Sequence, residues 1–111
     1  MKENLHNERT AVWLDSFEGI TLKQKFLLLD YFVEPQNLFD NFSSDAEFIK
    51  AVIGDANYNK MSYVKNDDYI DRVIESYQKE GIGYVSRYSE KYSNLLRQIT
   101  KPPLILYYKG D

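Results

Sequence analysis

The stretch GIGYVSRYSEKYSNLLRQITKPPLILYYKGD, residues 81–111, decides the fold class because its pattern changes type twice. Residues 82–88 and 104–108 are rich in β-branched, aliphatic and aromatic side chains, which favours strands. Between them a helix is predicted by apolar residues at helical spacing, namely Tyr92, Leu95, Leu96 and Ile99. The predicted order is strand, helix, strand, and residues 88–103 are long enough for a crossover between parallel strands.

The first 80 residues have helical rather than strand patterning. Thr21 is a suitable N-cap, and Pro35 forbids continuation of the helix that Thr21 starts. The apolar stripe predicted to be buried in this helix is Leu22, Phe26, Leu29 and Phe32 or Val33. We therefore expect an α+β fold with a helical domain of four to five short helices in residues 1–80. A β-α-β unit with two parallel strands is expected to follow in residues 81–111.

Charge is unevenly distributed along the 111 residues, whose formal net charge is −3. Residues 1–55 contain five Lys or Arg and ten Asp or Glu, whereas residues 56–111 contain nine and seven. An acidic surface repels phosphate backbones, and strong nucleic-acid modules show clustered Lys and Arg. The charge pattern therefore disfavours tight nucleic-acid binding by the first half.

The chain contains no Cys, which excludes disulfides, zinc-thiolate sites and thiol catalysis within it. Its longest apolar runs are far shorter than a bilayer span, and the first residues lack the apolar stretch of a secretory signal. We expect a cytoplasmic protein that does not contact a membrane.

Residues 81–111 also resemble a known family. The DNA-processing proteins DprA/Smf have the pattern "GI..VS......YP..L..I..PP..LYYKGN" before their nucleotide-like Rossmann domain. Matching residues occur here in the same order: Gly81-Ile82, Val85-Ser86, Tyr92, Leu95-Leu96, Ile99, Pro102-Pro103, Leu104 and the run from Leu106 to Asp111. The family's Tyr-Pro is replaced by Tyr92-Ser93.

The helical region resembles the same family more weakly. That family often begins with a helical SAM-like, helix-hairpin-helix-like domain containing "WL.L....GIG......LL..F". The corresponding residues are Trp13-Leu14, Gly19-Ile20-Thr21, Leu28-Leu29 and Phe32. Thr21 replaces the second glycine of the hairpin, one of the two that let the backbone approach a phosphate.

The resemblance implies a function for the family as a whole, which protects incoming single-stranded DNA and helps load RecA during natural transformation. The family's "VG.R..S.YG" region, which engages DNA and RecA, is not among these 111 residues. The chain is therefore expected to be an N-terminal piece, expressed as a fragment or naturally truncated. We expect it to act as a non-catalytic protein-interaction or regulatory module.

The candidate nucleic-acid contacts are basic residues near the hairpin and the C-terminal end. Lys23 and Lys25 follow the hairpin and could touch phosphates, but Asp15, Glu18 and Asp30 are near in sequence, which favours an ordinary solvated face. The remaining basic candidates are Arg87, Lys101 and Lys109.

Four tyrosines interleave with the basic residues of the C-terminal end. They are Tyr84, Tyr88, Tyr107 and Tyr108. Aromatic side chains among basic ones are typical of single-strand stacking platforms, which leaves weak nucleic-acid binding as the alternative function. Strand alternation and interface enrichment equally favour tyrosines that cover the sheet or meet a protein partner.

No catalytic, cofactor or metal site is predicted. His6, the only His, lies near the N-terminus and has no partners in the sequence for a catalytic triad or a zinc site. No small-molecule substrate is expected. A protein partner, or self-association through the edge of strand 104–108, is expected instead, because an apolar strand with an open edge tends to pair with another strand.

Overall fold

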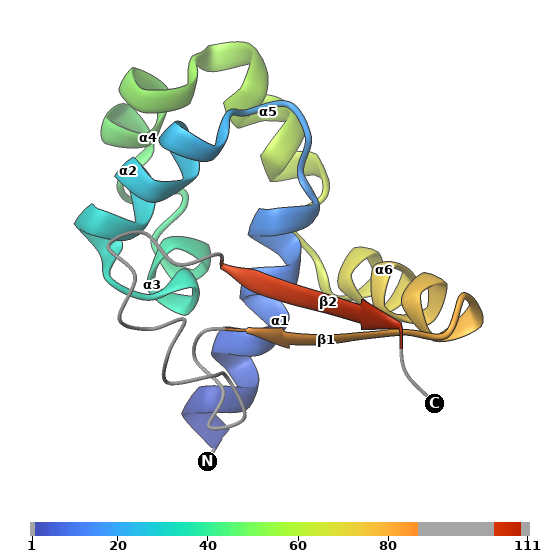
Figure 1. Cartoon of the computed structure of the whole chain (residues 1–111). Coiled ribbons are helices and arrows are strands. Elements are labelled where there is room, and N and C mark those ends of the chain that lie inside the picture. Colours follow the sequence, from blue (N-terminus) through green and yellow to red (C-terminus); the bar gives the residue numbers. More distant parts are fainter. Residues whose placement is uncertain (1, 87–103, 110–111) are drawn as a thin grey trace.

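The computed structural model describes the backbone of residues 2–86 and 104–109, and the side chains of residues 7–86 and 104–108. These residues form six helices followed by two strands (Figure 1). The elements are α1 (Lys2–Ser16), α2 (Leu22–Phe32), α3 (Pro35–Asp40), α4 (Ala46–Ile53), α5 (Asp55–Tyr63), α6 (Asp67–Lys79), β1 (Ile82–Ser86) and β2 (Ile105–Lys109). The predicted α+β class is confirmed, although with six helices rather than four or five. The helix predicted between the strands lies outside the described residues.

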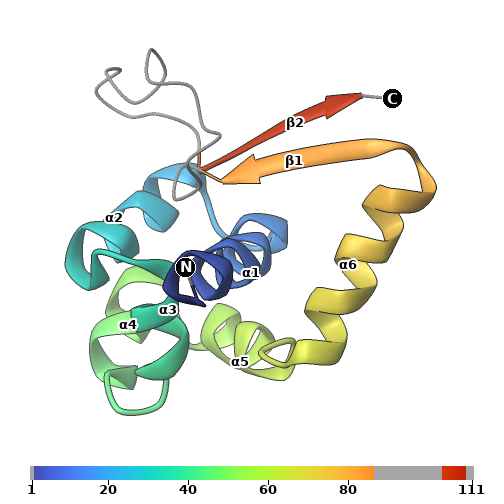
Figure 2. The ribbon, with the colours of Figure 1, turned by 90° about the horizontal axis from the view of Figure 1, so that it is seen from below.

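Helix α1 lies at the centre of the molecule. Four consecutive residues, Ala11, Val12, Trp13 and Leu14, are each fully buried, so the helix is covered on every side at this level. It packs against α3, α6 and both strands. Figure 2 shows α1 with α2 and α4 on one side and α6 on the other.

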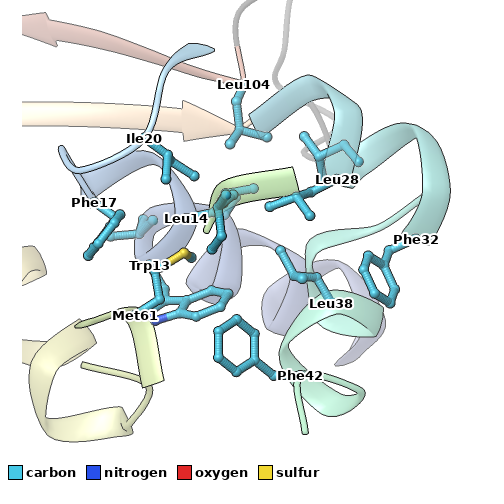
Figure 3. Close-up of a cluster of buried hydrophobic side chains, with 14 of the residues drawn as sticks. Trp13, Leu14, Phe17, Ile20, Leu28, Phe32, Leu38, Phe42, Met61 and Leu104 are labelled. Carbon is cyan, nitrogen blue, oxygen red and sulfur yellow. The ribbon is translucent and has the colours of Figure 1, made fainter. Parts of the chain in front are cut away.

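The core gathers around Trp13. Its indole meets the rings of Phe39 and Phe42 edge-on, with centroids 5.2 and 5.7 Å away. Phe42 is stacked in turn on Tyr58 of α5 at 4.4 Å. Leu104, just before β2, enters the same core between Ile20 and Leu28 (Figure 3). The sheet and the helices therefore share one hydrophobic core.

The N-terminus of α2 is capped as predicted. The Thr21 hydroxyl accepts a hydrogen bond from the Gln24 amide, and the Gln24 side chain accepts one from the Thr21 amide, at 3.1 and 2.8 Å. Burial of Leu29 and Phe32 is confirmed, but Leu22 of the predicted stripe is exposed and Leu28, which was not in it, is fully buried. The spacing allowed either set, and packing of α2 against α3 and α4 selects the observed one.

Helix α2 ends in a strained residue. Glu34 precedes a proline and is held in an extended conformation, with φ −127° and ψ 146°. The change of backbone conformation between the helix and the extended Glu34 therefore occurs at Val33, whose φ is 72° and ψ is −48°. A β-branched residue rarely adopts positive φ, and such backbone strain costs about 1–3 kcal/mol.

The two strands pair antiparallel, so the predicted parallel pairing is wrong. Ser86 lies opposite Ile105, Tyr84 opposite Tyr107, and Ile82 opposite Lys109. This direction puts the buried residues Ser86 and Ile105 at the same end of the sheet, next to the core. A parallel partner would carry Ile105 to the other end, away from Ile20 and Leu28. A connection of this length permits either direction, and burial of the start of β2 decides between them.

Figure 1 shows the sheet lying across α1 with its far end beside α6. On its outer face the ring of Tyr108 lies over Gly83. A Cβ atom on Gly83 would come within 2.3 Å of the Tyr108 ring, so this close approach requires glycine. The aromatic ring shields backbone that the glycine leaves uncovered.

Leu27 and Leu28 test the assignment of the buried face. We expect Leu28→Ala to lower the free energy of unfolding by about 2–5 kcal/mol, because Leu28 is fully buried and its loss leaves a cavity. Leu27→Ala should cost less than about 1 kcal/mol, because that side chain is 46% exposed. Urea melts measure both values, and equal losses would contradict the assigned face.

Val33 tests the strain at the end of α2. Val33→Gly should raise the free energy of unfolding by about 1 kcal/mol, because glycine adopts positive φ without steric cost and relief of strain exceeds the loss of backbone entropy. Val33→Ala is the matched control, since alanine retains the Cβ atom that causes the strain. Comparable stabilisation by both substitutions would show that the backbone conformation is not the cause.

Candidate interaction surfaces at the hairpin and the sheet

In the hairpin between α1 and α2, Thr21 and Gln24 form hydrogen bonds within the protein. The capping box uses the amides of Thr21 and Gln24, which a phosphate at this helix end would otherwise contact. The Gln24 side chain amide also donates to the backbone carbonyl of Val52 in α4 at 3.1 Å. The first turn of α2 is thereby bound to the rest of the protein.

Lys25 is likewise engaged within the protein. Its Nζ atom donates to the backbone carbonyl of Asp15 at 2.8 Å, satisfying an open carbonyl in the last turn of α1. Burial lowers the pKa of Lys25, although the negative charges of Asp15 and Glu18 oppose this shift. Lys23 is exposed on another side of α2. The two lysines therefore do not form one positively charged cluster.

Two of the candidate tyrosines face the helices. Tyr84 and Tyr107 are opposite each other in the sheet and share a face. Both rings contact Tyr77 of α6, with centroid distances of 5.8 and 5.4 Å. We call Tyr77, Tyr84 and Tyr107 the tyrosine cluster. It joins the sheet to α6.

A hydrogen-bond chain runs from the tyrosine cluster to α1. The Tyr107 hydroxyl donates to the Asp15 carboxylate, and its oxygen lies 3.3 Å from the Tyr77 hydroxyl. Because the Tyr107 proton is directed at Asp15, Tyr77 must donate to Tyr107. Burial raises the pKa of Tyr107 well above its ordinary value, and the bond to Asp15 raises it further. Burial also raises the pKa of Tyr77 and of Tyr84.

Among the other candidates at the C-terminal end, Tyr108 is the one whose side chain the structure describes. Tyr108 lies on the outer face of the sheet, where its ring covers Gly83. Lys109 ends β2, while its side chain and the residues Arg87, Tyr88 and Lys101 lie outside the described part. The described candidate tyrosines are thus divided between two faces of the sheet, as strand alternation requires.

Sequence reasoning missed the partners of these residues. From the sequence, Asp15 is interpreted as part of a solvated face, and Tyr77 is not among the candidate residues. Neither the carboxylate nor the hydroxyl carried a local signal, because their partner Tyr107 is remote in sequence. Ser16 is a further case, with its hydroxyl 3.0 Å from that of Tyr69 in α6.

A second polar region was also missed. A depression of about 590 Å³ lies between α1, α3 and α6, with Arg9 on its wall. The Arg9 guanidinium contacts Asp71 at 2.9 Å and Asp67 at 3.3 Å. Burial alone would lower the pKa of Arg9, but these two carboxylates outweigh it and raise the pKa. The Arg9 cation is thus paired with two carboxylates of α6, and these ion pairs link α6 to α1.

The described side chains offer no site for a metal ion, since no three His, Cys, Asp or Glu among them lie close enough together. None of the helices in the described part of the chain is long and apolar enough to cross a membrane. Comparison of the sequence with models of protein families and with curated proteins, and of the structure with solved structures, finds no match.

The phenol of Tyr107 should make the protein sensitive to alkali. Unfolded Tyr107 loses its proton near pH 10, whereas the folded protein retains it to higher pH. The unfolded state then binds fewer protons, so the free energy of unfolding should fall as pH rises above about 10. Tyr107→Phe should make this fall shallower in urea melts between neutral and alkaline pH.

The matched control is Tyr63→Phe, which changes an 85% exposed ring on α5 and should keep the wild-type pH dependence. At neutral pH, Tyr107→Phe should cost about 1 kcal/mol, because the Asp15 carboxylate loses a donor at a half-exposed site. An unchanged alkaline slope in Tyr107→Phe would show that the bond to Asp15 does not hold the phenol neutral.

Proposed function

We propose that this chain is a non-catalytic accessory region of a DprA/Smf-like DNA-processing protein and acts through protein contacts. Its role would be regulatory or docking. The DNA-related steps, protection of single strands and loading of RecA, would belong to the Rossmann domain that the resemblance implies. A cytoplasmic location follows from the same proposal.

One observation carries this proposal. The motif elements Gly81-Ile82 with Val85-Ser86, and Leu106 to Lys109, are separated in sequence but form the paired strands β1 and β2. The described parts of the quoted pattern therefore belong to one sheet. This unit packs on the helical region through α1 and α6, which supports the order of parts that the resemblance implies, although its strands are antiparallel rather than parallel.

Electrostatics and hydrogen bonding favour protein contacts over phosphate contacts at the hairpin. The Thr21 and Gln24 amides at the start of α2 are capped internally, and Lys25 is bound to the Asp15 carbonyl. The first 55 residues carry an excess of negative charge, which repels a phosphate backbone. These features support a module whose partner is not nucleic acid.

We expect the isolated chain to bind single-stranded DNA negligibly at physiological salt. Fluorescence anisotropy with a labelled oligothymidine measures this directly, and a titration at low salt shows any weak electrostatic contact. A submicromolar complex at physiological salt, weakened by Lys23→Glu and Lys25→Glu, would contradict the proposal and favour the nucleic-acid-binding alternative. Asp30→Asn, which removes one negative charge from α2, is the matched control and should not create tight binding.

The coding frame tests the family assignment independently. A frame that continues past Asp111 into a glycine-rich "VG.R" region would support a DprA/Smf-like protein. A frame that continues past Asp111 into unrelated sequence would overturn the assignment.

A further inference from the structure

Helix α2 is apolar on its outer side as well as on its buried side. Among the described residues there are seven exposed large apolar side chains, and four of them belong to α2 or directly follow it. They are Leu22, Leu27, Tyr31 and Val33. A helix that is apolar around most of its circumference is normally covered on both sides. Figures 1 and 2 both show α2 at the periphery of the helical part.

The outer side of α2 has a defined stripe. Positions 23, 27, 30 and 31 have the i, i+4, i+7, i+8 spacing of a single helix face. At the end of this stripe the Tyr31 ring is stacked on Phe48 of α4 with a centroid distance of 4.0 Å, and meets Phe32 edge-on at 4.9 Å. These contacts hold the exposed Tyr31 ring in one orientation. A rigid aromatic side chain is a typical anchor of a protein interface.

The charges on this stripe are opposite in sign at its two ends. Lys23 and Asp30 are seven residues apart, two helical turns or about 10 Å along the same side of α2. Glu34, exposed just beyond the helix, adds negative charge at the Asp30 end. An antiparallel copy of α2 would place Lys23 of each helix beside Asp30 of the other. A parallel copy would place like charges together.

We propose that the outer side of α2, comprising Lys23, Leu27, Asp30 and Tyr31, is a homodimer surface that takes an antiparallel second copy. Leu27 and Tyr31 supply the apolar contact between two symmetric ion pairs. Interfaces of this small size are weak, so the dimer forms only at high protein concentration. This inference goes beyond the proposed function and does not rest on the DprA/Smf resemblance.

Analytical ultracentrifugation over a wide concentration range tests the proposal. We expect a reversible monomer–dimer equilibrium that Leu27→Ala and Tyr31→Ala each weaken by roughly tenfold or more. Lys23→Glu and Asp30→Lys should each weaken the dimer, and the double variant should restore it because the ion pairs form again with reversed sign. Tyr63→Ala, at an exposed ring on α5, is the control that leaves the equilibrium unchanged. Circular dichroism confirms that each variant is folded.

Three outcomes would overturn the proposal. The first is a monomer at all concentrations. The second is a dimer that no α2 variant weakens but that Val85→Lys, on the outer face of β1, abolishes. That result would assign self-association to the sheet. The third is a double charge variant that remains as weak as the single ones, which would show that Lys23 and Asp30 do not meet across an antiparallel interface.

Discussion

Complete burial of four consecutive residues in α1 is the constraint on which the rest of the structure depends. A helix can bury Ala11, Val12, Trp13 and Leu14 together only if other elements cover it on all sides. Helices α3 and α6 and the sheet provide this cover. The buried indole N–H of Trp13 has no hydrogen-bond partner among the described residues. The free-energy cost of this unpaired donor is offset by burial of the large apolar surface of the indole.

The C-terminal turn of α1 connects three other parts of the molecule. Its Asp15 carboxylate receives the Tyr107 hydroxyl, the Asp15 carbonyl receives Lys25, and the Ser16 hydroxyl meets Tyr69. Two side chains that could have contacted a nucleic acid, Lys25 and Tyr107, are therefore used to hold β2 and α2 against α1. These contacts leave the outer side of α2 exposed, which is the surface of the proposed homodimer.

Local patterns in the sequence predicted helices within residues 1–80 and strands near residues 82–88 and 104–108. Thr21 begins α2, the proline after Glu34 limits its end, and β-branched and aromatic residues form both strands. Each of these signals depends only on residues close together in sequence, so it can be recognised without knowledge of the tertiary structure. The α+β class followed from them. The candidate lysines and tyrosines were chosen from the sequence alone, and their roles stay predictions.

Only the tertiary structure decided the strand direction, the buried face of α2 and the partners of the candidate side chains. A connection between two strands permits either direction, and burial of Ile105 beside the helical core selects the antiparallel one. Likewise, Leu22 and Leu28 are both compatible with a helical stripe, and only the position of α3 and α4 distinguishes them. The physical reason is the same in each case: these choices depend on contacts between residues remote in sequence, which a local pattern does not encode.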